Sequence, residues 1–349
     1  MSADFPVIEG EYLRDILDQP RALENTLVGL EVSKELSQLA SRVQKGRFKA
    51  VVLTGMGSSF HALHPFYLEL IDAGLNAVMV ETSELIHYQS RLFDPKNLMV
   101  AVSQSGRSAE VVRLIQKNRG RSPIIGVTNT PDSPLARRSA ACVMTRAGKE
   151  FSVSCKTYLA SLMGLRWLAD VICGRDLRRS RRELQSAPES VKSYLGKWKE
   201  HVQQLGERLR NVRQLFVVGR GSSLAAAGTG ALIIKEADHF PAEGMSSAAF
   251  RHGPFEMIGN ETFVAIFGGD RKTRDLNRGL FLDIRNNRGQ AELIAQDSEF
   301  APFALPEVPG SVLPIIEVLP AQMITIALAA LAGREAGRFS HCAKVTTKE

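Results

Sequence analysis

Two segments of this chain, about half its length apart, share one pattern of residues. Residues 48–59 read FKAVVLTGMGSS and residues 214–223 read QLFVVGRGSS, so each β-branched apolar run ends in Gly-x-Gly-Ser-Ser. The glycine pairs begin at Gly55 and Gly219 in a chain of 349 residues. Self-similarity at this spacing indicates that a domain-sized unit occurs twice.

Apolar runs alternate with helix-like stretches in both copies, as in residues 108–117 (SAEVVRLIQK). Strands that alternate with helices favour a parallel sheet with helices on both faces. The fold class expected is therefore α/β, with two such units in tandem. Further strands are expected at residues 77–80, 98–102, 123–127 and 142–144 of the first copy and at 263–267, 292–295 and 312–317 of the second.

Length and composition suit two soluble globular domains. The mass is 38.3 kDa, with 44% hydrophobic and 23% charged residues, which excludes a disordered or disulfide-scaffold protein. The first residues, MSADFPVIEG, are unlike a signal peptide, and the apolar stretch 324–333 is too short to cross a bilayer. The cysteines lie far apart, without metal-ligand spacing. We expect a cytoplasmic location, no membrane partner, no metal and no cofactor.

The net charge is +7, and the densest basic run is RDLRRSRR at residues 175–182. Such a run indicates either nucleic-acid binding or a solvated helix face. No aromatic side chains interleave with it, so we expect a helix face and no nucleic-acid partner. A mildly basic protein also attracts anionic metabolites such as sugar phosphates.

Residues 103–108, SQSGRS, directly follow the apolar run LMVAV. Hydroxyls and backbone N–H groups where a strand ends and a helix begins are typical of an anion cradle. The alternative is ordinary helix capping by Ser105 or Ser108. Capping needs one such residue, whereas this loop has three serines and a glutamine, which favours the cradle. The turn 55–59 is a candidate second wall.

A carboxylate and an imidazole occur in the second copy, at Glu236 and His252. Together such groups move protons at neutral pH, although spacing alone does not show that the two side chains meet. The last residues, AKVTTKE at 343–349, have the composition of a frayed polar tail.

Several motifs in order resemble the double-SIS (sugar isomerase) family. That family includes the isomerase half of glutamine–fructose-6-phosphate aminotransferase and glutaminase-free amino sugar phosphate deaminases and deglycases. The resemblance runs almost end to end and rests on YLRDILDQPRALENTL, TGMGSS, SQSGRSAE, RAGKEFSVSCKTY, GRGSS, KEADHFPAEG, RHGP and AKVTTKE. It implies an N-terminal segment (1–27), SIS domain 1 (28–185), SIS domain 2 (186–335) and a C-terminal tail that closes the active site (336–349).

The resemblance also implies roles for particular residues. Glu236 would be the isomerising base, His252 the ring-opening histidine, and Lys344 the lysine that forms a Schiff base with the open-chain ketose. The family's histidine acts across a dimer interface, so a homodimer is implied. The phosphate of a sugar 6-phosphate would be bound by Ser58, Ser59, Ser103, Gln104, Ser105 and Ser108.

Some positions depart from the aminotransferase. No glutaminase domain precedes the repeats, so we expect that glutamine is not the nitrogen donor within this chain. Thr229 and Ile233 replace a glutamate and a lysine on the catalytic helix, and Ala249 replaces a glutamate. The second copy has FGGD at 267–270 where the first has SQSG, so one phosphate site per chain is expected.

The resulting hypothesis is a phosphosugar isomerase that deaminates an amino sugar 6-phosphate to a ketose 6-phosphate and ammonia. One alternative is a deglycase that splits a 6-phosphofructosyl amine. A second alternative is a non-catalytic sensor of sugar phosphates, which would need the cradle but no acid and base.

Overall fold

A computed structural model of the chain describes residues 6–341 and 343–346. It divides into two compact units, each discontinuous in sequence. The first-repeat unit comprises Arg21–Lys149, Lys156–Ser186 and Cys342–Glu349. The second-repeat unit comprises Met1–Pro20, Glu150–Cys155 and Ala187–His341. The sequence boundaries after residues 27, 185 and 335 stay predictions.

The first-repeat unit is built on a parallel five-stranded sheet, in the order β2-β1-β3-β4-β5. The middle strands β1 and β3 are buried along their whole length, which explains their unbroken apolar runs. The strands are β1 (Ala50–Gly55), β2 (Ala77–Glu81), β3 (Asn97–Val102), β4 (Ile124–Thr128) and β5 (Ala141–Met144).

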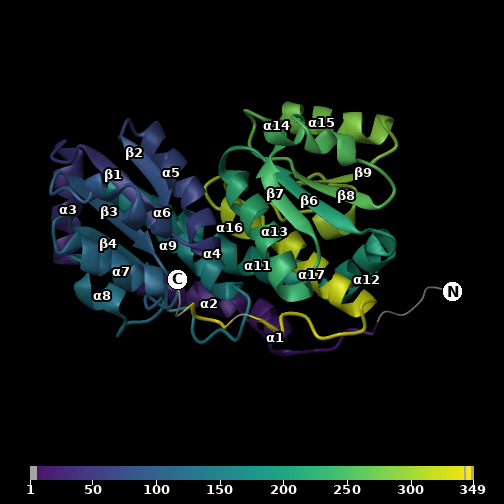
Figure 1. Cartoon of the computed structure of the whole chain (residues 1–349), viewed down its shortest axis with the longest axis horizontal. Helices are drawn as coiled ribbons and strands as arrows, with labels where there is room; N and C mark the ends of the chain where they lie inside the picture. The colour runs from purple at the N-terminus through teal and green to yellow at the C-terminus, as the bar shows by residue number, and fades with distance from the viewer. Residues whose placement is uncertain (1–5, 342, 347–349) are drawn as a thin grey trace. The chain divides into compact units, whose positions relative to one another are not determined.

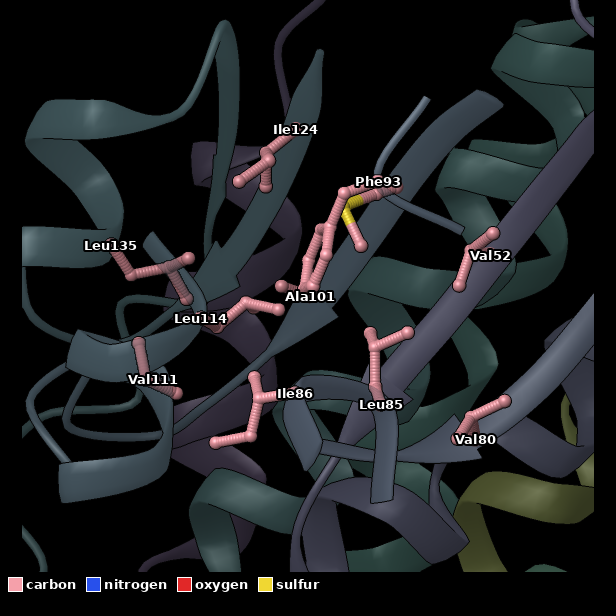
Figure 2. Close-up of a cluster of buried hydrophobic side chains, with 11 residues drawn as sticks. Val52, Val80, Leu85, Ile86, Phe93, Ala101, Val111, Leu114, Ile124 and Leu135 are labelled. Carbon is pink, nitrogen blue, oxygen red and sulfur yellow. The ribbon is translucent and has the colours of Figure 1, made fainter. Parts of the chain in front are cut away.

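Helices cover both faces of this sheet, so the expected fold class is confirmed. One face carries α3 (Lys34–Gln44), α5 (Leu63–Asp72), α9 (Lys156–Cys173) and α10 (Leu177–Leu184), and the other carries α6 (Thr82–His87), α7 (Ala109–Asn118) and α8 (Pro134–Arg138). Figure 2 shows the apolar cluster under α6, α7 and α8, in which Leu85, Leu114 and Leu135 pack against strand residues. The remaining elements are α2 (Gln19–Gly29), α4 (Gly57–His61) and the 3-10 turn η1 (Ser90–Leu92).

The second-repeat unit has a parallel four-stranded sheet, in the order β7-β6-β8-β9. Its strands are β6 (Gln214–Gly219), β7 (Ala242–Ser246), β8 (Thr262–Phe267) and β9 (Gln290–Ile294). On one face lie α14 (Ser247–Phe250) and α15 (Arg274–Asn286), and on the other lie α13 (Leu224–Asp238) and α17 (Leu319–Leu331) (Figure 1). The other elements are α1 (Glu11–Leu17), α11 (Ser186–Leu195), α12 (Trp198–Leu209), η2 (Gly221–Ser223), η3 (Pro254–Met257), η4 (Ala301–Phe303) and α16 (Leu313–Ile316).

Two helices, α16 and α11, each have a proline in the first turn. The strand expected at residues 312–317 is wrong, because this stretch forms α16, with Pro314 in its first turn. Proline suits that position, since the first N–H groups of a helix have no partner within it. Pro188 likewise lies in the first turn of α11.

The segment Leu313–Leu331 is long and apolar enough to cross a membrane by length and composition alone. In the structure 89% of its most apolar window is buried, and α17 packs against α12 and α13. A helix buried to this extent is a core helix, because the rest of the protein covers its apolar side chains.

Candidate functional site

The loops after β1 and β3 lie side by side at one edge of the first sheet. Residues Thr54 and Ala101 pair in register near the ends of these strands. From there the chain runs to β2 on one side and to β4 on the other. This is a topological switch point, where ligands of open α/β sheets bind outside the carboxyl ends of the strands. The structure therefore brings Ser58 and Ser59 to the same edge as residues 103–108.

Hydrogen bonds inside the 103–108 loop shape it around its serines. The Ser103 Oγ accepts the Gly106 N–H at 3.1 Å, and the Ser105 Oγ accepts the Arg107 N–H at 3.2 Å. Each hydroxyl still has its proton to donate. The Gln104 carbonyl oxygen accepts the Thr128 hydroxyl at 3.1 Å, which ties the loop to β4.

Gly106 lets the 103–108 loop turn sharply. Its φ is +58°, a conformation that favours glycine, and a Cβ at this position would lie 2.3 Å from the Ser133 Oγ. The capping alternative is not what the structure shows at Ser108, because Ser108 is the N-cap of α7 but its side chain makes no capping hydrogen bond. Its hydroxyl is half-buried at the start of the helix.

The C-terminal segment meets the 103–108 loop in the same unit. The Ala109 N–H, at the first residue of α7, donates to the Thr346 carbonyl oxygen at 3.1 Å. Lys344, two residues earlier, is half-buried. Of the expected tail, residues 342 and 347–349 lie outside the described residues. The tail residues 343–346 thus belong with the serine loops.

Glu236 lies half-buried in the last turn of α13, in the second-repeat unit. Glu236 belongs to the same unit as Tyr12, and its charge affects the pKa of the Tyr12 hydroxyl. Burial raises the pKa of Tyr12 well above its usual value, and the nearby acidic groups of Cys155, Asp238 and Glu236 raise it further. Tyr12 is fully buried, and its hydroxyl lies 3.4 Å from the Thr325 hydroxyl.

Gly337, which follows α17, lies against Tyr12 and the last turn of α13. The Gly337 N–H donates to the Ala237 carbonyl oxygen at 3.1 Å, beside Glu236 in the chain. The φ of Gly337 is +78°, and a Cβ there would lie 2.7 Å from the Tyr12 Cβ. The last turn of α13 is therefore held between segments from both ends of the unit.

His252 lies in an exposed turn after α14. Its N–H donates to the Ala249 carbonyl oxygen at 2.9 Å, and the neighbouring Arg251 pairs with Asp283 at 2.6 Å. Gly253, with φ +133°, ends the turn. The turn is thus fixed to α15, and the imidazole is left at the surface.

Glu236 and His252 lie at opposite edges of the second sheet. Helix α13 starts after β6 and ends before β7, so from Leu224 to Glu236 it covers about 18 Å. His252 comes after β7, whose five residues span roughly 17 Å. One copy of the second-repeat unit therefore does not bring the two side chains together.

The departures on α13 are core positions. Thr229 and Ile233 are both fully buried, and the Thr229 hydroxyl has no hydrogen-bond partner in the described part of the chain. Ala249 is exposed and donates its N–H to the Ser246 hydroxyl at 3.0 Å.

Sequence reasoning missed two buried acids, Asp238 and Glu150. Asp238, two residues after Glu236, is only 7% exposed, and neither of its carboxylate oxygens has a hydrogen bond within the described chain. Burial raises the pKa of Asp238, and Arg334, 3.7 Å away, lowers it in part. Glu150 is also buried, and its Oε1 accepts the Cys155 N–H at 3.0 Å. Within residues 6–341 and 343–346, no group of three or more His, Cys, Asp or Glu could hold a metal ion.

The chain matches known proteins over most of its length. The model of the family described as "SIS domain" matches residues 47–170 and again 208–332. Over 348 residues the chain is 28% identical to glutamine–fructose-6-phosphate aminotransferase of Pyrococcus horikoshii. That alignment covers 97% of this chain and 57% of the relative, so the chain spans little more than half of its length.

Solved structures agree with the fold. The C-terminal domain of glucosamine-fructose-6-phosphate aminotransferase from Francisella tularensis matches with a TM-score of 0.82 and 21% identity, over 95% of this chain and 98% of that one. Glucosamine-6-phosphate deaminase from Thermotoga maritima matches with a TM-score of 0.76 and 19% identity, over 97% and 100%. With a family match in each half and this architecture, the chain belongs to the SIS-domain family and carries two SIS domains in tandem.

Proposed function

We propose that this protein is a phosphosugar isomerase that deaminates an amino sugar 6-phosphate, with a ketose 6-phosphate and ammonia as products. One observation carries the proposal. The two serine-bearing loops lie together at the switch point of the first sheet, and the tail that holds Lys344 is hydrogen-bonded to the start of α7 beside them. The names of the relatives support the substrate class, since each contains a sugar 6-phosphate.

The phosphate is assigned to the first repeat. Ser58, Ser59, Ser103, Gln104, Ser105 and Ser108 offer hydroxyl, amide and backbone donors to its oxygens. Hydrogen bonds to a charged group are stronger than those between neutral groups, and the N-terminus of α7 favours a negative charge. Holding the phosphate fixes the open sugar chain far from the reacting carbons.

The proton chemistry is assigned to Glu236. Its carboxylate removes the proton from C2 of the open-chain amino sugar and returns one to C1, which moves the double bond from C1 to C2. The resulting C2 imine takes up water and releases ammonia, leaving the C2 carbonyl of the ketose. A positioned base of this kind typically contributes ~10²–10⁴-fold in rate. Lys344 supplies an amine that can form a Schiff base with the ketose carbonyl.

The ring-opening proton transfer is assigned to His252 of a second copy of the chain. The separation of Glu236 and His252 across the second sheet supports this assignment, and with it a homodimer. Mixing Glu236→Gln chains with His252→Asn chains tests it: mixed dimers should regain activity, because one of their two sites receives both wild-type residues. Mixed dimers that form but stay inactive would contradict the shared site.

Product analysis tests the reaction itself. Purified protein is incubated with glucosamine 6-phosphate and, separately, with a 6-phosphofructosyl amino acid. Ammonia and fructose 6-phosphate from the first substrate support the deaminase. Glucose 6-phosphate from the second would indicate the deglycase instead. Binding of either compound without product would indicate a sensor. Glu236→Gln serves as the inactive control and Glu243→Gln, an exposed position on β7, as the matched surface control.

A further inference from the structure

The second sheet has a switch point of the same kind as the first. It lies between β6 and β8, which are adjacent in the order β7-β6-β8-β9. The loop after β6 carries Ser222 and Ser223 in the repeated Gly-x-Gly-Ser-Ser pattern, so Ser223 corresponds to Ser59 of the first copy. Helix α13, of 15 residues, begins directly after Ser223.

A carboxyl group of the chain itself enters this switch point. The Ser223 Oγ donates to the Glu317 Oε1 at 2.6 Å. Ser223 is 0% exposed and Glu317 is 1% exposed. Glu317 comes from the short segment between α16 and α17, far along the chain. The loop after β8 closes on the same hydroxyl, since a Cβ at Gly269 would lie 3.8 Å from the Ser223 Oγ.

The surroundings of Glu317 leave hydrogen-bonding groups unused. Its second oxygen, Oε2, has no partner in the described part of the chain, and neither has the Oδ1 of the fully buried Asn277. The Asn277 Nδ2 donates to the Gly268 carbonyl oxygen at 3.1 Å, which fixes α15 to the loop after β8. A buried, unpartnered carboxylate oxygen costs free energy, so stability alone does not explain an acid at this position.

We propose that the second repeat keeps the anion site of the fold and fills it with the Glu317 carboxyl group, so that it is a latent site for a tetrahedral oxyanion such as phosphate. The comparison with the first repeat rests on the proposed phosphate cradle, but the site itself rests on Ser223, Glu317 and the start of α13. A carboxyl group has acceptor oxygens like those of such an anion, and the start of α13, at Ser223, favours negative charge.

The charges around the site limit how tightly it binds an anion. Asp270, at the end of the loop after β8, is the charged neighbour that acts on the Glu317 carboxyl group, and it opposes negative charge there. Its Oδ1 accepts the Lys272 N–H at 3.0 Å, so its place in the loop is fixed. An emptied site should therefore bind phosphate more tightly when Asp270 is neutralised.

Calorimetric titration of the full chain with inorganic phosphate tests the proposal. Glu317→Ala should bind one phosphate per chain more than the wild type, and Glu317→Ala with Asp270→Asn should bind it more tightly. Glu317→Gln keeps a side chain of the same size in the site, so it should bind no more phosphate than the wild type. Adding Ser223→Ala to Glu317→Ala should abolish the additional phosphate binding. A folded Glu317→Ala protein that binds no more phosphate than the wild type, with or without Asp270→Asn, overturns the proposal.

A second measurement covers the case in which Glu317→Ala fails to fold in chloride buffer. The variant is then refolded in phosphate and in chloride of equal ionic strength, beside Glu317→Gln. Recovery in phosphate alone supports the latent site, and equal failure in both buffers contradicts it. Neither measurement uses sugar turnover, so the test of the latent site does not depend on whether the proposed activity is found.

Discussion

The backbone N–H of Ala109 donates to the carbonyl oxygen of Thr346, so the start of α7 is bonded to the far end of the chain. This bond takes one of the N–H groups that a helix leaves unpaired at its start. It also places the tail residue Lys344 in the same unit as the serine loops. The first-repeat unit therefore carries both a candidate anion cradle and a candidate amine.

Replacing Lys344 with Gln should lower kcat by about 10²-fold, because the amide cannot form a Schiff base or carry a proton. The KM should change little, since the phosphate contacts are on other residues. Steady-state assays on glucosamine 6-phosphate check this. Thr346→Ala is the control: it keeps the carbonyl oxygen that Ala109 uses, so its activity should stay near that of the wild type.

Replacing both Ser103 and Ser105 with Ala should weaken binding of a sugar 6-phosphate. Each lost hydrogen bond to a charged group costs roughly 1.5–3 kcal/mol. Calorimetric titration measures the loss, and circular dichroism verifies that the protein stays folded. Ser37→Ala, on the exposed face of α3, is the matched control. Unchanged affinity in the double variant would show that this loop does not bind the phosphate.

Gly337→Ala should destabilise the protein more than Gly333→Ala. Both glycines have positive φ, +78° and +63°, so both variants carry backbone strain. Only at Gly337 does the new Cβ collide with Tyr12, whereas nothing lies within 4 Å at Gly333. Overpacking adds roughly 1–3 kcal/mol, which denaturant unfolding resolves. Equal losses in the two variants would contradict the tight contact beside Glu236.

Stability should depend on pH through Glu317. Burial, followed by the charge of Asp270, raises the pKa of Glu317 from 4.5 to about 7. Between these values the folded state holds a proton that the unfolded state has lost, so the unfolding free energy falls as pH rises. The full loss, about 3 kcal/mol, is reached above pH ~7.

Glu317→Gln cannot ionise, so its stability should lack this decline. Urea unfolding of the wild type and the variant at pH 5 and pH 8 checks it. The wild type should lose more stability than the variant over that range. Parallel losses in the two proteins would show that Glu317 does not titrate there.

The central strands of the first unit could be anticipated because they are buried on both faces and read as unbroken apolar runs, as in residues 98–102. The same criterion failed at residues 312–317, where an apolar run of that length suits a buried helix as well as a strand. The proline in its first turn was the available signal.

The serine loop could be anticipated because its residues are consecutive and follow a strand. The contacts of Gly337 with Tyr12, and of Ser223 with Glu317, could not, because they join residues remote in sequence and no local pattern records them. Glu236 and His252 are separated because β7 runs between them from one edge of the second sheet to the other. That separation could not be read from the sequence alone.

The most direct test of the account is the turnover of glucosamine 6-phosphate by Glu236→Gln. Glutamine keeps the shape and the hydrogen-bonding head of the side chain but cannot accept a proton. The kcat of Glu236→Gln should fall by about 10²-fold or more, with substrate affinity near that of the wild type, and Glu243→Gln should be fully active. Near-normal turnover by Glu236→Gln would contradict the assignment of Glu236 as the base.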